Sequence, residues 1–364
     1  MIVLALNSGS SSFKFGLYRV EASRTDPLLS DTIPASNAEE AVAGVLKLLA
    51  GSKVPTPTAI GHRLVHGGLA LRKHCLIDAS VMQRLEAAVA FAPLHMPRAL
   101  SFIRIAQERF PGMPQVACFD TSFHAGLPDV ARVLPLPKEM QLEGIQRYGF
   151  HGLSCESIIR QLGHDLPDRI VIAHLGNGAS VTAIKRGKSI DTSMGLTPAG
   201  GVVMGTRSGD LDPGVLLYLM REKKFDAAKL AELIDHQSGL LGISGISSDM
   251  RHLHEAAAEN PDARLAIQMF CYSVGKQIAA MIAVLDGIDL LVFTGGIGEN
   301  DAQVRSAICS RLSWIGVNLD EGRNRSADNP VNGAASRCEV QVIASQESEQ
   351  IARHTRALAA SGLR

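Results

Sequence analysis

The sequence is poor in aromatic residues and has no net charge. Phe, Trp and Tyr make up 4% of its 364 residues, and 36 Lys and Arg balance 36 Asp and Glu. Proteins that bind nucleic acid usually carry an excess of basic residues, so this balance argues against that class. Small anionic substrates remain compatible with it, because they need only a local cluster of basic groups.

Long apolar runs and closely spaced cysteines are also missing. The apolar run at residues 2–6 is too short for a signal peptide, and the run at 278–285 is too short to cross a bilayer. The six cysteines show no C-x-x-C spacing, which favours reduced thiols over disulfides or a structural zinc site. We therefore expect a cytoplasmic protein that does not enter a membrane.

The common nucleotide-binding and hydrolase motifs are absent. Gly187–Lys188–Ser189 resembles the end of a P-loop, but Thr182 stands where the first glycine is required. The sequence has no G-x-G-x-x-G after a strand pattern and no G-x-S-x-G. His254 and Glu255 do not extend to H-E-x-x-H, because the fifth position is alanine. P-loop, dinucleotide-binding, serine hydrolase and zinc protease chemistries are therefore poor fits.

One strand–turn–strand pattern occurs twice in the sequence. Residues 2–6 and 13–18 are strand-like and flank a polar turn, and residues 170–174 and 181–184 repeat the arrangement around a Gly-rich turn. Such hairpin patterns are common, so a coincidence would look the same. Two copies nevertheless indicate a duplicated domain.

Strand-like and helical segments alternate in the rest of the chain. Strands are expected at residues 58–64, 116–119 and 290–294, and helices at 80–91, with Ser80 as its N-cap, at 226–234, at 263–285 and from about 299. This alternation favours an α/β fold. Two Gly-rich segments, 199–214 and 237–245, are expected to be irregular loops, which often carry function.

Three turns have the composition of a phosphate-binding site. They lie at residues 7–12, just before Lys14, at residues 174–178, and at residues 293–300, where a strand leads through glycines into a helix. Small residues let backbone N–H groups approach an anion, and a helix N-terminus favours negative charge. Each turn alone would also fit a polar surface turn. Together, in a chain without a P-loop, they predict a different nucleotide-binding architecture.

Ten ordered segments make the sequence resemble the acetate kinase family, within the superfamily of sugar kinases, heat-shock chaperones and actin. These segments are residues 7–14, 61–68, 93–95, 119–124, 147–152, 174–178, 191–195, 204–210, 238–251 and 293–300. The resemblance implies an α/β fold of two duplicated ribonuclease-H-like domains, of the actin-like ATPase kind, with a cleft between them. It places the acyl-substrate domain at residues 1–123 plus about 349–364, and the nucleotide-binding and dimerisation domain at 124–348.

The resemblance also implies an activity and its cofactors. The expected reaction is reversible, direct in-line phosphoryl transfer from ATP to acetate, which gives acetyl phosphate and ADP and depends on Mg²⁺, with Mn²⁺ as a possible substitute. A homodimer is implied as well. Two other activities stay open: a propionate kinase of the same family, and an ATP-switched binding protein like actin or the heat-shock chaperones.

Catalytic roles follow from the resemblance for Asp120, His151 and Arg207. Arg207 is expected to hold the transferred phosphoryl group, whose oxygens suit a guanidinium fork, although it could instead form a salt bridge with Asp210 or Asp212. Acetate is already ionised near pH 7, since carboxyl pKa values are roughly 4, so Asp120 is expected to orient groups or hold Mg²⁺ rather than act as a base.

Binding roles are implied for the remaining site residues. The acyl substrate is expected to contact Arg63 and His95 and an apolar wall formed by Val65, Leu94, Phe150 and Pro198. ATP is expected to contact Lys14, His174, Leu175, Gly176, Asn177, Gly178, Asp249, Met250, Arg251, Gly296, Ile297, Gly298, Glu299 and Asn300. The expected Mg²⁺ contacts are Asn7 and Glu347, although Glu347 would also fit a solvated charge in a helix's first turn.

The sequence departs from the family pattern next to these residues. Leu153 and Cys155 replace the usual Thr and His after His151, and Ser348 replaces an acidic residue after Glu347. Hydrogen bonding around His151 and around the metal contacts is therefore expected to differ in detail.

Overall fold

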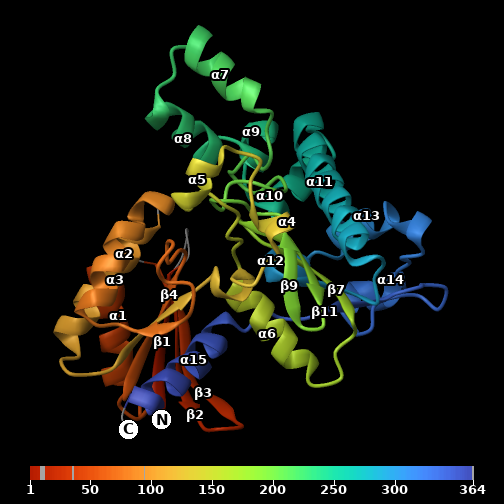
Figure 1. Ribbon diagram of the computed structural model, residues 1–364. Coiled ribbons are helices and arrows are strands. Elements are labelled where there is room, and N and C mark those ends of the chain that lie inside the picture. Colours follow the sequence, from red (N-terminus) through yellow and green to blue (C-terminus); the bar gives the residue numbers. More distant parts are fainter. Residues whose placement is uncertain (9–12, 35–36, 94, 363–364) are drawn as a thin grey trace.

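The computed structural model describes residues 1–8, 13–34, 37–93 and 95–362, and it consists of two lobes, each built on a mixed sheet (Figure 1). The first sheet contains β1 (Ile2–Ser8), β2 (Phe13–Val20), β3 (Thr25–Ile33), β4 (Ala59–Leu64), β5 (Cys75–Leu76) and β6 (Gln115–Phe119). The second contains β7 (Arg169–Leu175), β8 (Ala179–Lys185), β9 (Lys188–Thr192), β10 (Leu290–Thr294) and β11 (Glu339–Val342).

The two sheets share one topology. Their strand orders are β3-β2-β1-β4-β6-β5 and β9-β8-β7-β10-β11. In each, the first three strands form an antiparallel meander, and the next two run parallel to the first. Only the short β5, antiparallel to β6, is additional. The repeated order confirms the predicted duplication of an actin-like ATPase domain.

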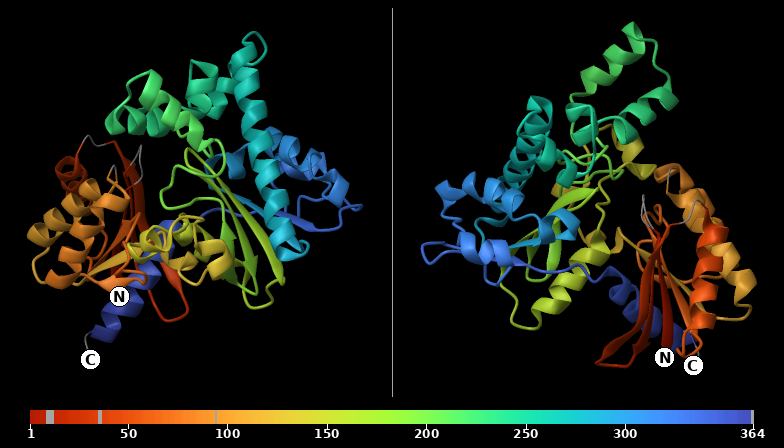
Figure 2. Two further views of the ribbon diagram at one scale, coloured as in Figure 1. Left: turned by 45° about the horizontal axis from the view of Figure 1, so that its top comes forward. Right: turned by 180° about the vertical axis from the view of Figure 1, so that it is seen from behind.

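Helices cover both faces of the first sheet because β1 alternates its side chains. Leu4 and Leu6 pack in one cluster with residues of α1 (Ala38–Gly51) and α3 (Met96–Arg109). Val3 and Ala5 point to the other face and pack against α15 (Glu347–Gly362). The C-terminal helix therefore returns to the first lobe, beside the N-terminus (Figures 1 and 2). The helix α2 (Ala79–Ala87) and a 3₁₀ turn (Ala88–Phe91) precede α3.

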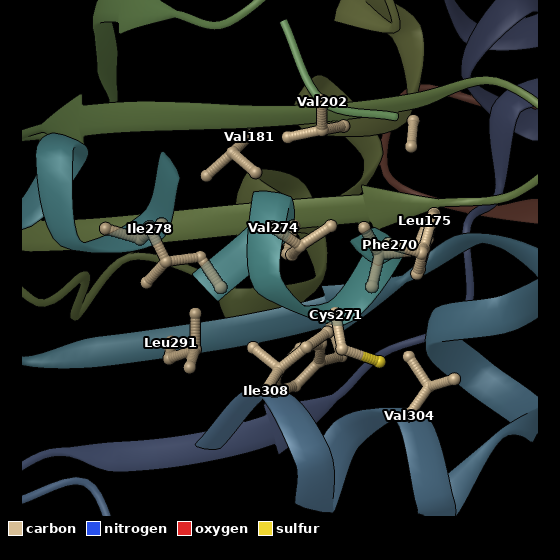
Figure 3. Packing of buried hydrophobic residues seen from close by; sticks show 14 of the residues in the cluster. Leu175, Val181, Val202, Phe270, Cys271, Val274, Ile278, Leu291, Val304 and Ile308 are labelled. Atoms are coloured by element: carbon tan, nitrogen blue, oxygen red, sulfur yellow. The ribbon is translucent and has the colours of Figure 1, made fainter. Parts of the chain in front are cut away.

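The second sheet lies between α11 (Pro261–Leu285) and α6 (Gly152–Leu162). On the α11 side, Leu175 and Val181 lie in the core with Phe270 and Val274 (Figure 3). The opposite face of β7 packs with Ile158 of α6. The other helices of this lobe are α7 (Pro213–Glu222), α8 (Ala227–His236), α9 (Gly239–Ser244), α10 (Met250–Ala256), α12 (Gly295–Asn300), α13 (Ala302–Ser310) and α14 (Glu321–Ser326).

Between the lobes, the chain passes through three short elements before α6. They are a 3₁₀ turn (Ser122–His124), α4 (Asp129–Arg132) and α5 (Lys138–Leu142). The predicted boundary of the two domains at residue 123 falls in this connection, and the predicted return at about residue 349 falls in the first turn of α15. This division stays a prediction.

Most predicted elements are present, with three corrections. The expected strands coincide with β4, β6 and β10. The cap of α2 is Asp78, whose Oδ1 accepts from the Val81 N–H at 2.7 Å, rather than Ser80. The segment 237–245 contains α9, so it is not wholly irregular, and α12 begins at Gly295, earlier than expected. Residues 199–212, all of them described, form the expected irregular loop.

The helix α11 is long and apolar enough, by length and composition alone, to cross a membrane. The apolar run at 278–285 is only the C-terminal part of this helix, which begins at Pro261. Its buried side chains, including Phe270, Val274 and Ile278, pack against the sheet and α13 (Figure 3). The core helix of a soluble protein meets the same criterion, so the expectation that the protein does not enter a membrane stays a prediction.

Candidate active site

The carboxyl ends of three neighbouring strands bring Asn7, Arg63 and Asp120 together. Asn7 lies near the end of β1, Arg63 near the end of β4, and Asp120 directly follows β6. These strands are parallel and adjacent, and the Asp120 N–H continues the pairing by donating to the Leu64 carbonyl at 2.9 Å. Parallel strands therefore deliver all three side chains to one edge of the sheet, where ligands of α/β proteins usually bind.

Arg63 and Asp120 form a two-pronged ion pair. Arg63 Nε donates to both carboxylate oxygens at 3.0 Å, and Nη2 donates to Oδ2 at 2.7 Å. Burial raises the pKa of Asp120, against the lowering effect of Arg63. Burial alone would lower the pKa of Arg63, but Asp120 and Glu347 raise it above its usual value. The pair holds the guanidinium in one orientation.

Glu347, near the other end of the chain, joins the group formed by Asn7, Arg63 and Asp120. Its Oε2 accepts from Asn7 Nδ2 at 2.9 Å and lies 3.7 Å from Arg63 Nη1, which donates to Asn7 Oδ1 at 3.1 Å. Burial raises the pKa of Glu347, but Arg63 and His174 together lower it below its usual value. Glu347 does lie in the first turn of α15, yet it is a partnered side chain rather than a solvated charge. Carboxylate and amide oxygens of this kind are the donors that Mg²⁺ prefers.

His151 is held in an unusual conformation at the start of α6. Its φ of 58° lies in the left-handed region, which a side chain other than glycine adopts at a cost in energy. The His151 Nδ1 and Ser180 Oγ atoms are 2.9 Å apart, and the ring stacks on His174 at 4.2 Å between centroids. Burial, His174 and the two arginines lower the pKa of His151 well below its usual value. The ring is therefore neutral near pH 7.

Arg207 and His151 meet at Gly178. A methyl group added at Gly178 would lie 3.4 Å from both terminal nitrogens of Arg207 and 3.4 Å from His151 Nε2. Arg207 Nη1 donates to the Pro198 carbonyl at 2.8 Å. Burial lowers the pKa of Arg207, which nearby Asp235 partly offsets. The His151 ring and the Arg207 guanidinium therefore face one small space beside the Gly178 backbone.

The acidic residues near Arg207 have other partners. Asp210 Oδ1 accepts from the Gly201 N–H at 2.7 Å, and Asp212 Oδ1 accepts from the Gly214 N–H at 2.9 Å. Arg207 therefore does not form the salt bridge with Asp210 or Asp212 that the sequence left open, within the described part of the chain.

Two cavities, of about 740 and 1090 Å³, adjoin at this point. Both are lined by Arg63, Val65, His95, Gly176, Asn177, Arg207, Gly296 and Asn300. Burial and the charges of Arg207 and Arg63 lower the pKa of His95 to about 4. The cleft between the lobes is thus one continuous space with two compartments, and its junction carries two arginines.

The predicted residues of the acyl pocket gather in the smaller cavity. It is lined by Asp120, His151, Arg207, Arg63, His95, Val65, Phe150 and Pro198, together with Asn7 and Glu347. Leu94, predicted for the same pocket, lies outside the described residues. These side chains come from both lobes, so only the tertiary structure brings them together.

The predicted nucleotide residues are divided between the two cavities, with two exceptions. Lys14, His174, Gly178 and Glu299 line the smaller cavity, and Asp249, Met250, Arg251 and Ile297 line the larger. Leu175 and Gly298 are not among the described residues that line either one. Leu175 points into the α11 core because side chains of β7 alternate, and Gly298 is buried, with its carbonyl accepting from Arg305 Nη1 at 2.9 Å.

Several residues of the larger cavity were not predicted. Asp235 and His236 lie at the C-terminal end of α8, and His254 and Asp301, which also line the cavity, form a contact of 2.8 Å. The sequence offers no signal for His254 beyond an incomplete zinc-protease motif. The apolar face of α8 predicted a helix, but nothing in its sequence showed that its last turn faces the cleft.

Of the three departures from the family pattern, Leu153 and Cys155 are accommodated in the core. Leu153 packs with Ile351 of α15, and burial raises the pKa of the Cys155 thiol to about 12. Ser154, between them, lies 2.8 Å from His174 Nδ1 through its Oγ. Cys155 is therefore an inert thiol, and α6 contacts the site through Ser154 and through the Gly152 N–H, which donates to the Asp120 carbonyl at 2.8 Å. Ser348 lines the smaller cavity.

Comparison with known proteins gives consistent matches over the whole chain. The model of the acetokinase family matches residues 31–353. The acetate kinase of Nitrobacter hamburgensis is 41% identical over 390 residues, covering 98% of this chain and 96% of its own. A propionate kinase from Francisella tularensis superposes with a TM-score of 0.90 at 36% identity, and Porphyromonas gingivalis acetate kinase with 0.87 at 36%; each alignment covers 98% of this chain and 99% of the other. The chain therefore belongs to the acetokinase family.

Proposed function

We propose that this protein transfers the terminal phosphoryl group of ATP to acetate, reversibly, to give acetyl phosphate and ADP. The observation that carries this proposal is the pair of adjoining cavities: Arg63 and Arg207 line both, and His151 lines the smaller one beside Arg207. One cavity is of a size for a nucleotide, and the smaller is walled in part by Val65, Phe150 and Pro198. Membership of the acetokinase family supports the same reaction.

In this proposal the side chains of the site bind or orient the charged groups that take part in the phosphoryl transfer. Acetate enters as the carboxylate, so no proton has to be removed and no general base is needed. Arg207 contacts the transferred phosphoryl oxygens, and neutral His151 donates a hydrogen bond to them. Asp120 keeps Arg63 oriented toward the acyl substrate. Preorganised donors of this kind stabilise phosphoryl-transfer transition states.

Magnesium fits the donor atoms at the edge of the first sheet. Asn7, Glu347 and Asp120 supply amide and carboxylate oxygens within one hydrogen-bonded group, and Mg²⁺ or Mn²⁺ would be held there. When bound, the ion neutralises charge on the phosphate oxygens. Lys14, which pairs with Asn7 across β1 and β2, and the Gly176–Gly178 turn of the other lobe would bind phosphates.

A homodimer is part of the proposal, and exposed apolar side chains support it. Leu217 and Tyr218 are neighbours on α7, Leu265, Met269 and Tyr272 follow one another at i, i+4 and i+7 on α11, and all five are exposed. Neighbouring exposed apolar side chains of this kind occur at association surfaces. Leu217→Ser with Tyr218→Ser should shift the protein to monomer in sedimentation analysis, whereas Leu142→Ser on exposed α5 should not. A wild-type monomer would contradict the dimer. Residence in the cytoplasm, without membrane or nucleic-acid partners, also remains proposed.

Propionate is the second candidate substrate, because one superposed structure is a propionate kinase. Half-buried Val65 packs beside the acyl pocket and would crowd a longer chain. A pocket distinguishes one methylene by only about 1–3 kcal/mol. We therefore propose acetate as the better substrate and propionate as a slower one.

Trapping of acyl phosphate with hydroxylamine tests the function directly. Wild-type protein with ATP, Mg²⁺ and acetate should form acetyl hydroxamate, with lower kcat/KM for propionate and butyrate. Arg207→Lys should reduce turnover at least a hundredfold, since a lysine cannot provide the guanidinium fork. Arg186→Lys, at an exposed arginine, is the matched control. ATP turnover that does not depend on acetate would favour an ATP-switched binding protein, and a clear preference for propionate would overturn the acetate assignment.

A further inference from the structure

A cluster of two histidines and a glutamate lies outside both cavities, where α6 meets α15. We call His74, Glu156 and His354 the Glu156 cluster. Glu156 Oε2 is 2.5 Å from His354 Nε2, and Glu156 Oε1 is 3.5 Å from His74 Nε2. The three come from the segment before β5, from α6 and from α15, two helices that lie side by side in Figures 1 and 2.

Two imidazoles and a carboxylate are also a donor set for zinc, but the tautomer of His74 argues against that. The Phe119 backbone N–H donates to His74 Nδ1 at 3.0 Å. A neutral ring that accepts at Nδ1 carries its proton on Nε2, the atom that faces Glu156. A metal would need the lone pair of that nitrogen, and metal-bound histidines usually donate from the other one. His74 therefore directs its Nε2–H toward Glu156 Oε1, although the 3.5 Å separation is longer than a formed hydrogen bond.

Glu156 is the charged centre of the cluster. Burial alone would raise the pKa of its carboxyl, but the adjacent His354 and His74 lower it to about 2. The carboxylate is thus ionised throughout the physiological range, with an imidazole on each oxygen. Such a charge-assisted contact restricts both partners more strongly than a neutral hydrogen bond does.

Each member of the cluster belongs to, or contacts, an element that has one end at the active site. His74 accepts a hydrogen bond from the backbone N–H of Phe119, the residue before Asp120. Glu156 follows His151 by five residues on α6. His354 follows Glu347 by seven residues on α15, about two helical turns. The cluster therefore connects the supports of three residues of the site.

We infer that the Glu156 cluster positions Asp120, His151 and Glu347 relative to one another. Its members are positioning residues, since none of them is among the described residues that line either cavity. A second contact, Arg160 Nη1 to Glu349 Oε1 at 3.1 Å, also joins α6 to α15. Loss of the cluster should therefore loosen the site rather than separate the helices. The inference rests on the proposed roles of the three positioned residues.

Steady-state kinetics of Glu156→Gln, His354→Ala and His354→Lys test the inference. Glu156→Gln keeps the side-chain size but removes the charge, and His354→Ala removes one donor. Both should lower kcat about tenfold, because small misplacements of catalytic groups are costly, while the KM for ATP stays within about twofold. His354→Lys should recover most of the kcat, because its ammonium group can donate to Glu156. His164→Ala, at an exposed histidine just beyond α6, is the matched control and should behave as wild type.

Three outcomes would overturn the inference. The first is a wild-type kcat in Glu156→Gln with only a lower melting temperature, which would show a stabilising role alone. The second is a kcat for His354→Lys no higher than for His354→Ala. The third is stoichiometric Zn²⁺ binding to wild type, absent in His354→Ala, in equilibrium dialysis. Arg207→Ala, measured in parallel, reports on the site itself: if it turns over normally, the proposed function fails, whereas an inactive Arg207→Ala beside a normal Glu156→Gln contradicts the positioning role alone.

Discussion

Arg63 directs two of its three nitrogens at Asp120, with contacts of 2.7 to 3.0 Å, and only Nη1 at Asn7 and Glu347. The guanidinium is thus held by a carboxylate of the protein itself. In the proposed function Asp120 acts through this pair, which joins the end of β6 to the end of β4. Under the proposed function, this relationship gives an acidic residue a role other than that of a general base.

Asp120→Asn should lower kcat at least a hundredfold at saturating Mg²⁺. The amide carries no charge to orient Arg63, which is left as a buried cation without its main partner, and the free energy of unfolding should fall by about 3 kcal/mol. Kinetics and urea denaturation measure the two effects. Asp26→Asn, which breaks the exposed pair of Arg24 and Asp26, should change neither. Near-normal turnover of Asp120→Asn would refute both the orienting role and a role in holding Mg²⁺.

Val65→Ala should shift the substrate preference toward propionate by about tenfold in relative kcat/KM. The smaller side chain leaves room for one methylene, a difference of about 1–3 kcal/mol in such a pocket. The comparison of acetate, propionate and butyrate as substrates measures the shift. Val130→Ala, at an exposed valine, is the control. An unchanged ratio would show that Val65 does not contact the acyl chain.

Gly178→Ala should lower kcat about tenfold with little loss of stability. The new methyl group would lie 3.4 Å from His151 Nε2 and the Arg207 nitrogens, so it fits but fills the space proposed for the phosphoryl group. Kinetics and thermal unfolding separate the two effects. Gly126→Ala, where a methyl group meets no atom within 4 Å, is the control. Full activity of Gly178→Ala would place the transferred group elsewhere.

The protein should lose stability as the pH falls from 6.5 toward 4. Burial lowers the pKa values of His62 and His124 to about 4, whereas the unfolded value is about 6.5. Between these values the unfolded chain binds more protons, so each histidine's contribution, up to about 3 kcal/mol, is fully present above pH 6.5 and is lost as the pH falls.

Urea denaturation between pH 7.5 and 4.5 measures this dependence. His62→Leu should show a shallower decline than wild type, because one of the titrating groups is removed. His252→Leu, at an exposed histidine, should decline like wild type. Equal slopes in all three proteins would contradict the assignment.

The local sequence determined the elements that have a short-range signal. Period-two and fully apolar runs predicted β4, β6 and β10, and the paired hairpin patterns predicted two related sheets. The sequence signal for a helix cap was weaker where two residues could serve, and Asp78 rather than Ser80 caps α2. The glycine content of residues 237–245 also concealed the short helix α9. Recognisable motifs supplied the candidate residues, but not their distances.

Only the tertiary structure decided which side chains share a space. Parallel pairing of β1, β4 and β6 brings Asn7, Arg63 and Asp120 to one edge, and α15 carries Glu347 back to that edge from 340 residues away. Alternation along β7 places Leu175 in the core, although the resemblance had included it among the nucleotide contacts, and nothing local showed that His74, Glu156 and His354 meet. Local sequence sets backbone preferences over a few residues, whereas contacts between distant residues depend on how whole sheets and helices pack, and that packing minimises the free energy of the complete chain.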